Sequence, residues 1–290
     1  MSQKRNFLAL GVMAKYWDPG RVKTRLAMSL SSSEERTPSL LAEVARKLNL
    51  GESTDAMNLA AMIHQRFVCH LLCQLSGAGD QRQLVATPPE RLRRFEATLA
   101  ERSISNWEVI DQGGGDLGDR MKSWFAGLLF PVPRSRAIAG EPLSEISDAS
   151  ETADRYRGRS CVLIGADCPL LSHADIENAW AQLQQNDVVI GPAFDGGYYL
   201  IGVRRSGADR DPLMSSPVTE TTLAGLFDGI AWSTETVFEQ TLTAANERGL
   251  SVAVLERRHD VDTAADLNRL VETIQRQYPH GHPLFQNSIP

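Results

Sequence analysis

The chain has 290 residues, 42% hydrophobic and 23% charged, which is enough to bury the core of one large α/β domain or two small ones. Its formal net charge of -6 gives no global basic field, so nucleic acid and anionic membranes are excluded as general partners. No apolar run reaches the length of a membrane span, and the four cysteines include no CxxC pair, so neither a zinc site nor a disulfide framework is indicated. We therefore expect a cytoplasmic protein.

The first predicted element is a buried strand over residues 7–14, and a loop that carries four cations follows it. These are Lys15, Arg21, Lys23 and Arg25. Guanidinium groups bind phosphate bidentately, an ammonium acts as a point charge, and the next helix start adds backbone donors. A solvated surface loop is the alternative, but the place after the first strand favours a polyphosphate site. It is not a Walker A loop, because the GxxxxGK[ST] pattern is absent.

A polar segment without a regular apolar pattern, 30–55, separates this loop from a long helix. Within this segment the sequence predicts only a short helix over 39–48. Apolar residues at helical spacing predict an amphipathic helix over 55–75. Its two histidines, His64 and His70, lie six residues apart and off a shared face. We expect them to be surface or packing residues and not ligands.

A glycine-rich turn follows the third predicted strand. Strands are expected over 83–86 and 107–110, and the second runs into three consecutive glycines that precede a helix. Glycine allows the backbone to approach a ligand closely, so Gly114, Gly115 and Asp116 are candidate nucleotide-binding residues. A tight connection with no ligand is the alternative.

The most informative stretch is 160–172, where a short apolar run leads directly to an acid. The run 161–164 predicts a strand buried on both faces, and Asp167 then lies at its carboxyl end, where open α/β sheets bind ligands. One acid there suits Mg²⁺ or Mn²⁺, which takes one or two carboxylates and fills its shell with phosphate and water. For Asp167 taken alone, a structural role as the cap of the next turn is an equal alternative to metal binding. Ser172 is expected to cap the next helix.

A second acid at this edge is expected between two further strands, 187–190 and 198–203. The turn that joins them holds Asp195, flanked by glycines on its carboxyl side. Asp195 is therefore a candidate for the site, and a hairpin turn with an Asp-Gly pair is the alternative.

The C-terminal part ends in a third group of acids. A loop is expected over 204–222, followed by a helix capped by Ser233 and a last strand. Asp262 or Thr263 is expected to cap the final helix, and a metal role for Asp260 or Asp262 is possible in addition. Residues 279–290 are expected to form a loose tail.

Five motifs occur in order along the chain: PGRVKTRL at 19–26, GDLGDRM at 115–121, LIGADCP at 163–169, GPAFDGGYYL at 191–200 and DVDTAADL at 260–267. Together they closely resemble a bacterial family of candidate glycosyltransferases, long described as a domain of unknown function and associated with radical-SAM or arsenosugar biosynthesis clusters. The resemblance covers nearly the whole chain outside 30–55 and 131–159, which look like insertions. It implies a single domain over 1–278.

The family belongs to the nucleotide-diphospho-sugar transferase superfamily, so the resemblance implies a GT-A-type, Rossmann-like α/β fold with a mostly parallel sheet and helices on both faces. With the chemistry of the residues, it implies a metal-dependent glycosyltransferase that transfers the sugar of a nucleotide sugar to a small-molecule acceptor and releases the nucleoside diphosphate, with Mg²⁺ or Mn²⁺. The implied site comprises Asp195 as catalytic residue; Lys15, Arg21, Lys23, Arg25, Gly114, Gly115 and Asp116 for the nucleotide; Asp167 and Asp262 for the metal; and Gly196, Gly197 and Tyr198 for the substrate pocket.

Two departures from the family pattern bear on this reading. The usual Lys-Ala-Pro-x-Pro-Gly loop is Lys-Tyr-Trp-Asp-Pro-Gly at 15–20, and the Asp-x-Asp motif of many GT-A enzymes is Gly-Ala-Asp at 165–167. Two rival functions stay open. One is nucleotidyl transfer from a nucleoside triphosphate, because the loop also resembles phospholactate guanylyltransferases. The other is a non-catalytic nucleotide-binding module.

Overall fold

A computed structural model describes residues 5–32, 38–51, 55–130, 158–205 and 218–285. The expected insertion over 131–159 lies outside the described residues except for its last two positions. The strands are β1 Phe7–Lys15, β2 Gln81–Thr87, β3 Glu108–Asp111, β4 Arg159–Gly165, β5 Val188–Pro192, β6 Tyr198–Arg205 and β7 Val252–Val254. The helices are α1 Thr24–Ser32, α2 Pro38–Lys47, α3 Ala56–Gln74, α4 Leu92–Glu101, α5 Leu117–Leu129, α7 His173–Leu183, α8 Glu220–Phe227, α9 Val237–Glu247 and α10 Ala264–Gln277, with 3₁₀ turns at Pro89–Arg91 and Pro283–Phe285.

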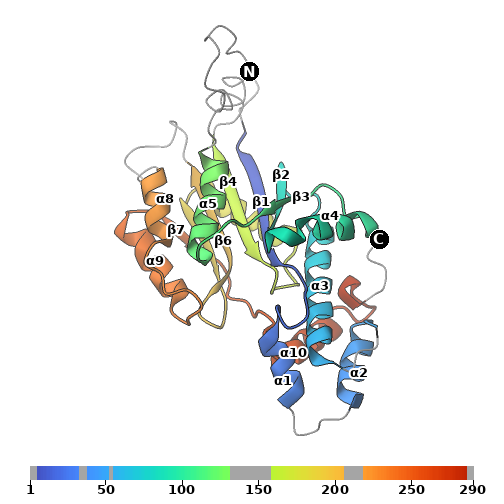
Figure 1. Cartoon of the computed structure of the whole chain (residues 1–290). Helices are drawn as coiled ribbons and strands as arrows, with labels where there is room; N and C mark the ends of the chain where they lie inside the picture. The colour runs from blue at the N-terminus through green and yellow to red at the C-terminus, as the bar shows by residue number, and fades with distance from the viewer. Residues whose placement is uncertain (1–4, 33–37, 52–54, 131–157, 206–217, 286–290) are drawn as a thin grey trace.

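The strands form one seven-stranded sheet in the order β3-β2-β1-β4-β6-β5-β7 (Figure 1). The β1–β2, β1–β4, β2–β3 and β5–β7 pairs are parallel, and β6 is antiparallel to both of its neighbours. The predicted α/β fold with a mostly parallel sheet is therefore confirmed. The exception arises at the turn around Asp195, because a short turn can only return the chain in the opposite direction.

The register brings the predicted site residues to one edge of the sheet. Gly165 at the end of β4 pairs with Met13, two residues before β1 ends at Lys15. Leu200 on β6 pairs with Ile164 on β4, so β6 begins at the edge where β4 ends. Parallel strands have their carboxyl ends on the same edge, and ligands bind there in open α/β sheets. The loops that follow β1, β4 and β5 therefore meet at this edge.

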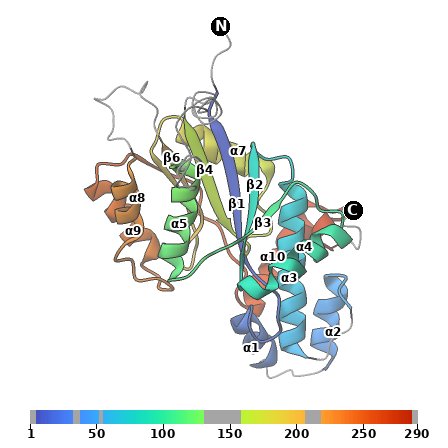
Figure 2. The same cartoon turned by 45° about the horizontal axis from the view of Figure 1, so that its top comes forward.

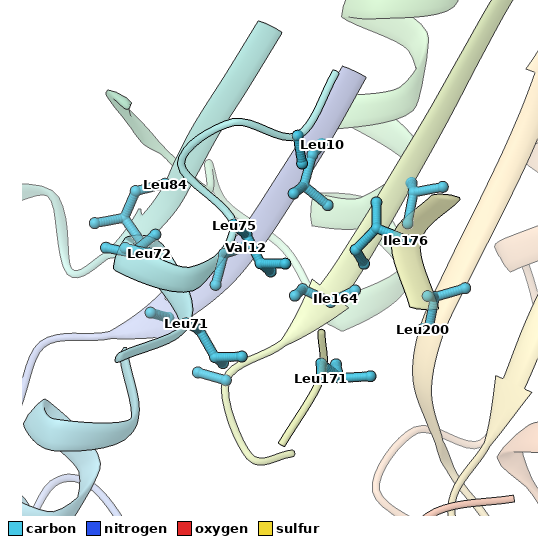
Figure 3. Close-up of a cluster of buried hydrophobic side chains, with 14 of the residues drawn as sticks. Leu10, Val12, Leu71, Leu72, Leu75, Leu84, Ile164, Leu171, Ile176 and Leu200 are labelled. Atoms are coloured by element: carbon cyan, nitrogen blue, oxygen red, sulfur yellow. The ribbon is translucent and has the colours of Figure 1, made fainter. Parts of the chain in front are cut away.

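Helices cover both faces of the sheet, as Figures 1 and 2 show. On one face, α3, α4 and α7 pack through a buried cluster that includes Leu71, Leu84 and Ile176 (Figure 3). On the other face, α5, α8 and α9 pack through a second cluster that includes Phe125 and Phe227. The middle of β4 is buried throughout, as the apolar run 161–164 predicts.

Helix α3 belongs to two parts of the molecule. Its second half, from Val68 onward, packs on the sheet, whereas its first half packs with α1, α2 and α10 in a third cluster. Figure 1 shows α1, α2 and α10 grouped beside the first half of α3, beyond the carboxyl edge of the sheet. His64 therefore lies where the helix passes that edge. Among the described residues, no helix is both long and apolar enough to cross a membrane.

Three local predictions are wrong. The sequence predicts a loop over 204–222, but helix α8 already begins at Glu220. The helix forms because its residues Leu223, Leu226 and Phe227 are buried in the second cluster. Ser233 does not cap α9, which begins at Val237 behind Thr236. The tail is not loose throughout, since Leu284 is fully buried against α3 and α10.

Candidate functional site

A pocket of about 430 Å³ opens at the carboxyl edge of the sheet, where the first, fourth and sixth strands meet. Its polar lining residues are Lys15, Arg21, Lys23, Thr24, Arg25, His64, Asp167, Tyr198, Tyr199 and Asp262. All four cations of the first loop thus line the same cavity as the acid that ends the central strand. The sequence prediction that these residues come together is consistent with this arrangement.

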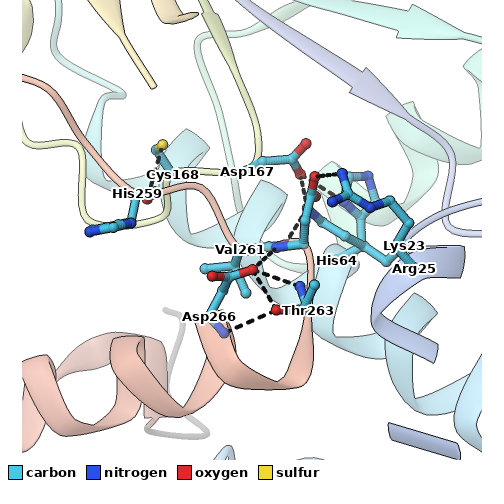
Figure 4. Close-up of polar contacts among 10 residues, drawn as sticks. Lys23, Arg25, His64, Asp167, Cys168, His259, Val261, Thr263 and Asp266 are labelled. Atoms are coloured by element: carbon cyan, nitrogen blue, oxygen red, sulfur yellow. Dashed lines mark hydrogen bonds and ion pairs between the residues drawn. The ribbon is translucent and has the colours of Figure 1, made fainter. Parts of the chain in front are cut away.

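The ammonium of Lys23 lies at the centre of the polar lining (Figure 4). Its Nζ is 2.6 Å from Asp167 Oδ1 and 3.0 Å from Asp262 Oδ1, and it donates to the carbonyl oxygen of Val261 at 2.6 Å. The Lys23 side chain is only 4% exposed, whereas Asp167 is 45% exposed. Lys23 is therefore a buried counterion that joins β4 to the segment before α10. The sequence predicts a cation at this position but not its pairing with Asp167 and Asp262.

The ion pair fixes the charge of both partners. Burial opposes ionisation of Asp167, but the nearby Lys23 outweighs it, so the pKa of Asp167 is lowered. Burial likewise opposes the charge of Lys23, and the two carboxylates outweigh it, so the pKa of Lys23 is raised. Oδ1 of Asp167 is buried, so the exposed part of its side chain leaves the other oxygen open to the pocket. A carboxylate held ionised in this way can still bind a ligand.

Backbone strain accompanies the site. Lys23 has a φ of 48°, in the left-handed region that residues with a side chain rarely occupy. Helix α1 begins at the next residue, so this turn places the first helical turn against the pocket. Strained residues of this kind cluster at functional sites, where the surrounding contacts over-determine them.

The other cations of the loop are more exposed than Lys23. Arg25 is 68% exposed, and its Nη1 pairs with Asp262 Oδ2 at 2.9 Å. Lys15 and Arg21 are exposed and line the pocket without an ion pair to any other described residue. Free cations beside a strand-end cavity are suited to an anionic ligand.

A second group of acids lies next to the pocket. Asp195, Asp260 and Asp262 each offer a carboxylate oxygen, and these oxygens lie within 4.8 Å of one another. Burial, Asp195 and Asp262 raise the pKa of Asp260 to about 6. Asp260, whose pKa the neighbouring carboxylates raise, has too little positive charge around it, and a divalent cation would supply that charge. The donor set therefore fits Mg²⁺ or Mn²⁺, and Asp262 belongs both to this group and to the Lys23 ion pair.

The turn that carries Asp195 is both an ordinary tight turn and a part of the acid group. Its Oδ1 accepts a hydrogen bond from the Gly197 amide at 2.9 Å, as in an ordinary Asx turn, while its carboxylate belongs to the acid group. Gly196 has a φ of 91°, and a Cβ there would lie 2.0 Å from the carbonyl oxygen of Glu235. Glycine is thus required where the turn packs against the start of α9. Of the three predicted pocket residues, Tyr198 lines the cavity.

The glycine-rich turn contributes differently from the expectation. Asp116 Oδ1 accepts from the Asp119 amide at 2.9 Å and caps α5 in a capping box. From this region Leu117 and Met121 line the pocket, whereas Gly114, Gly115 and Asp116 do not. Contacts of these three residues with a nucleotide remain a prediction.

His64 is a site residue that the sequence analysis missed. It and His70 are both buried, so the surface role considered for them is wrong. The His64 Nε2 lies 2.9 Å from the carbonyl oxygen of Lys15, and its Nδ1 lies 3.9 Å from Asp167 Oδ1. Burial lowers the pKa of His64. One signal was available in the sequence: a polar residue on the apolar side of a helix, between Ile63 and Phe67, is more informative than an exposed one.

The chain is similar to several solved structures. A candidate nucleotide-diphospho-sugar transferase from Desulfovibrio desulfuricans G20 is 26% identical with a TM-score of 0.64, over 97% of this chain and 93% of that one. The 4-diphosphocytidyl-2C-methyl-D-erythritol synthase from Anaerococcus prevotii DSM 20548 is 11% identical with a TM-score of 0.47, over 93% and 97%. Rv0371c from Mycobacterium tuberculosis H37Rv, in a complex with manganese, is 13% identical with a TM-score of 0.39, over 92% and 99%.

No curated protein matches the sequence. A family model does match it, over residues 72–234, and this range holds more than half of the chain. The match includes three of the five motifs, those at 115–121, 163–169 and 191–200. The chain belongs to the family described as an uncharacterized protein conserved in bacteria, DUF2064.

Proposed function

We propose that this protein is a transferase that uses a nucleotide-activated donor, in the first instance a nucleotide sugar. The observation that carries the proposal is the pocket at the carboxyl edge of the sheet, where free cations and an ionised acid line one cavity. The likeness to a candidate nucleotide-diphospho-sugar transferase, 26% identical over 97% of this chain, supports it.

The cations divide into two roles. Lys15 and Arg21 are exposed to the cavity, and Arg25 shares its charge with Asp262, so these three side chains bind the phosphates of the donor. Lys23 acts indirectly, because its ammonium is enclosed by Asp167, Asp262 and the Val261 carbonyl. It keeps Asp167 ionised and holds both carboxylates in place.

A divalent cation, Mg²⁺ or Mn²⁺, fits the acids at this edge. Asp167 offers its outer oxygen, and Asp262 offers a place in the group with Asp195 and Asp260. When bound, the cation neutralises charge that develops on the leaving diphosphate. The residues of the chain position the phosphates against it: Arg21 and Lys15 bind the oxygens, and the turn at Lys23 orients the first turn of α1.

Asp195 is the proposed catalytic residue. Its carboxylate is exposed at the rim, so it can reach the hydroxyl of a small acceptor that enters from solvent. If the reaction inverts the sugar, this carboxylate takes the proton of the attacking hydroxyl. Gly196 and Gly197 keep the turn narrow beside it, and Tyr198 forms part of the pocket wall.

The test is a binding and turnover screen. Wild-type protein is titrated with nucleoside diphosphates, nucleoside triphosphates and nucleotide sugars, with and without Mn²⁺, and binding is measured by calorimetry. Binding of a nucleotide sugar that Mn²⁺ strengthens, followed by release of its nucleoside diphosphate in the presence of an acceptor, is the expected result. Release of pyrophosphate from a triphosphate would instead indicate nucleotidyl transfer. Nucleotide binding with no turnover of any donor would indicate a binding module.

A further inference from the structure

The buried histidine at the inner wall of the pocket has one nitrogen without a partner. The His64 side chain is 6% exposed and lines the cavity from α3. Its Nε2 contacts the Lys15 carbonyl, whereas Nδ1 has no hydrogen-bond partner among the described residues. Buried polar atoms are nearly always paired, so an unpaired one beside a cavity indicates that its partner comes from the cavity.

The chemistry of Lys15 fixes which nitrogen carries the proton. A carbonyl oxygen can only accept, so His64 Nε2 must be the N–H that donates to it. An N–H on Nδ1 would need an acceptor of its own, and the carboxylate oxygen that faces it, Asp167 Oδ1, is 3.9 Å away, beyond hydrogen-bonding distance. With Nε2 donating to the carbonyl and Nδ1 unpaired, the geometry fits the neutral tautomer, in which Nδ1 is an acceptor. The group that faces the pocket is therefore an acceptor and not a donor.

The neighbours of Nδ1 do not donate to it. Asp167 Oδ1, 3.9 Å away, is itself an acceptor because its carboxyl is ionised. The Lys23 ammonium has three protons and is already enclosed by three acceptors at 2.6 to 3.0 Å. Two of these contacts are hydrogen bonds, to the Val261 carbonyl and to Asp262 Oδ1, and the described structure has no hydrogen bond from Lys23 to His64. Figure 4 shows His64 beside Lys23 and Asp167, with these contacts drawn.

We propose that His64 Nδ1 accepts a hydrogen bond from a sugar hydroxyl of the bound substrate, next to its phosphates. This deepens the proposed function and rests on it. A bare nitrogen beside an ionised carboxylate repels phosphate oxygens, whereas the cations Lys15, Arg21 and Arg25, which line the same cavity, attract them. In a nucleotide sugar, the groups next to the phosphates include sugar hydroxyls, and a hydroxyl can donate a hydrogen bond to Nδ1. The hydroxyl comes either from the ribose or from the transferred sugar, and the two sources are distinguishable.

The binding test uses wild type, His64→Phe and His64→Gln with three classes of probe: pyrophosphate, which has no sugar; UDP and GDP, which have a ribose; and UDP-glucose and GDP-mannose, which have both. We expect His64→Phe to bind hydroxyl-bearing probes about tenfold more weakly and pyrophosphate unchanged, since one buried hydrogen bond is lost. His64→Gln keeps an N–H for the Lys15 carbonyl and supplies an acceptor, so it should restore part of the affinity. A loss confined to the sugar esters assigns the transferred sugar, and a loss shared by UDP and GDP assigns the ribose.

His70→Phe is the matched control, because His70 is buried on the same helix and does not line the pocket. It should unfold at a temperature similar to that of His64→Phe and bind every probe as the wild type does. An equal loss of binding in both variants would show a general packing effect and overturn the proposal.

A second readout does not depend on any variant folding. In ¹⁵N spectra of wild-type protein with labelled histidine, His64 should show a protonated Nε2 and an unprotonated Nδ1. The Nδ1 signal should move when a hydroxyl-bearing probe binds and stay in place with pyrophosphate. A protonated Nδ1, or one that no nucleotide sugar moves, overturns the inference while leaving the proposed function intact. Wild-type protein that binds none of the nucleotides overturns both.

Discussion

Two acids at the same edge of the sheet, Asp167 and Asp260, have opposite electrostatic surroundings. Asp167 is opposed by burial but paired with Lys23, and its pKa is lowered. Asp260 is opposed by burial and faces Asp195 and Asp262, and its pKa is raised to about 6. Both residues are aspartates at one edge of the sheet, so the difference comes from their neighbours: Lys23 beside Asp167, and two carboxylates beside Asp260.

That lysine reaches only one side of the edge. Lys23 contacts Asp167 and Asp262, and Arg25 takes the second oxygen of Asp262. Asp195 and Asp262 raise the pKa of Asp260, and neither Asp260 nor Asp195 forms an ion pair with a cation in the part of the chain that the structure describes. One half of the site is thus complete without a ligand, and the other half has excess negative charge. An added divalent cation should offset the excess charge of the second half while the outer oxygen of Asp167 also binds it, and the following experiments examine both contributions.

The largest effect is expected from removing the buried cation. Lys23→Met should destabilise the protein by about 3 kcal/mol, because breaking a buried ion pair leaves uncompensated charge on Asp167 and Asp262. Urea unfolding monitored by circular dichroism at neutral pH measures this.

Arg25→Met is the matched control. Arg25 pairs with the same Asp262 but is 68% exposed, and exposed pairs contribute at most about 1 kcal/mol. Equal losses in the two variants would show that Lys23 is not the special cation and that the comparison above fails.

The next effect is on metal-linked binding. Asp167→Asn keeps the size of the side chain, and Lys23 keeps its contact with Asp262, so the protein should fold normally. An amide cannot offset the charge of a divalent cation, so the increase in nucleoside-diphosphate affinity caused by Mn²⁺ should disappear. Calorimetric titration with and without Mn²⁺ measures it. If the Mn²⁺ effect persists in Asp167→Asn and is lost in Asp262→Asn or Asp195→Asn, the cation binds in the second half alone.

A loss of nucleotide affinity without a loss of stability is expected when a cation that lines the pocket and has no ion pair among the described residues is removed. Arg21→Ala removes an exposed guanidinium that lines the pocket, and charge-assisted hydrogen bonds are strong enough for affinity to fall about tenfold. Nucleoside-diphosphate affinity should fall while the unfolding temperature stays constant. Arg93→Ala, which removes an exposed arginine on α4, should change neither quantity. Unchanged affinity in Arg21→Ala would remove this residue from the phosphate site.

Much of the fold follows from local patterns in the sequence. The apolar run 161–164, the cap at Ser172 and the long helix over 55–75 each reflect short-range chemistry, and the structure confirms all three. The edge at which Asp167 and Lys15 meet also follows, because strand ends of a parallel sheet share one edge. Patterns of this kind need no knowledge of distant contacts.

The polar pairings could not be predicted in the same way. Lys23 and Asp262 are 239 positions apart, and the loop offers four cations of which any could have been the buried one. A surface or packing role is predicted for His64 because it shares no helix face with His70, and this spacing does not show that the residue reaches a cavity. The local sequence does not predict where helix α8 begins, because the stability of this short helix comes from contacts with α5 and α9.

The smallest effect, a change with pH, tests the acid group directly. A carboxyl whose folded pKa is raised binds more protons when folded, so folding is favoured below the unfolded pKa and stability falls as pH rises through the folded value. For Asp260 that window runs from about pH 4 to the folded value of about 6. The lowered pKa of Asp167 acts in the opposite sense, and its contribution is lost only at more acidic pH. Relative to wild type, Asp260→Asn should therefore gain about 1 kcal/mol between pH 4 and 7, since screening of a partly exposed group reduces the effect.

Thermal unfolding of wild type and Asp260→Asn across this range measures the difference. The variant should be the more stable protein at pH 7 and should lose that advantage at pH 4. Mn²⁺ should stabilise the wild type at pH 7 and remove most of the gap, because a bound cation replaces the proton as the source of positive charge. Parallel pH profiles for the two proteins would show that Asp260 is already compensated, and the contrast with Asp167 would then not exist.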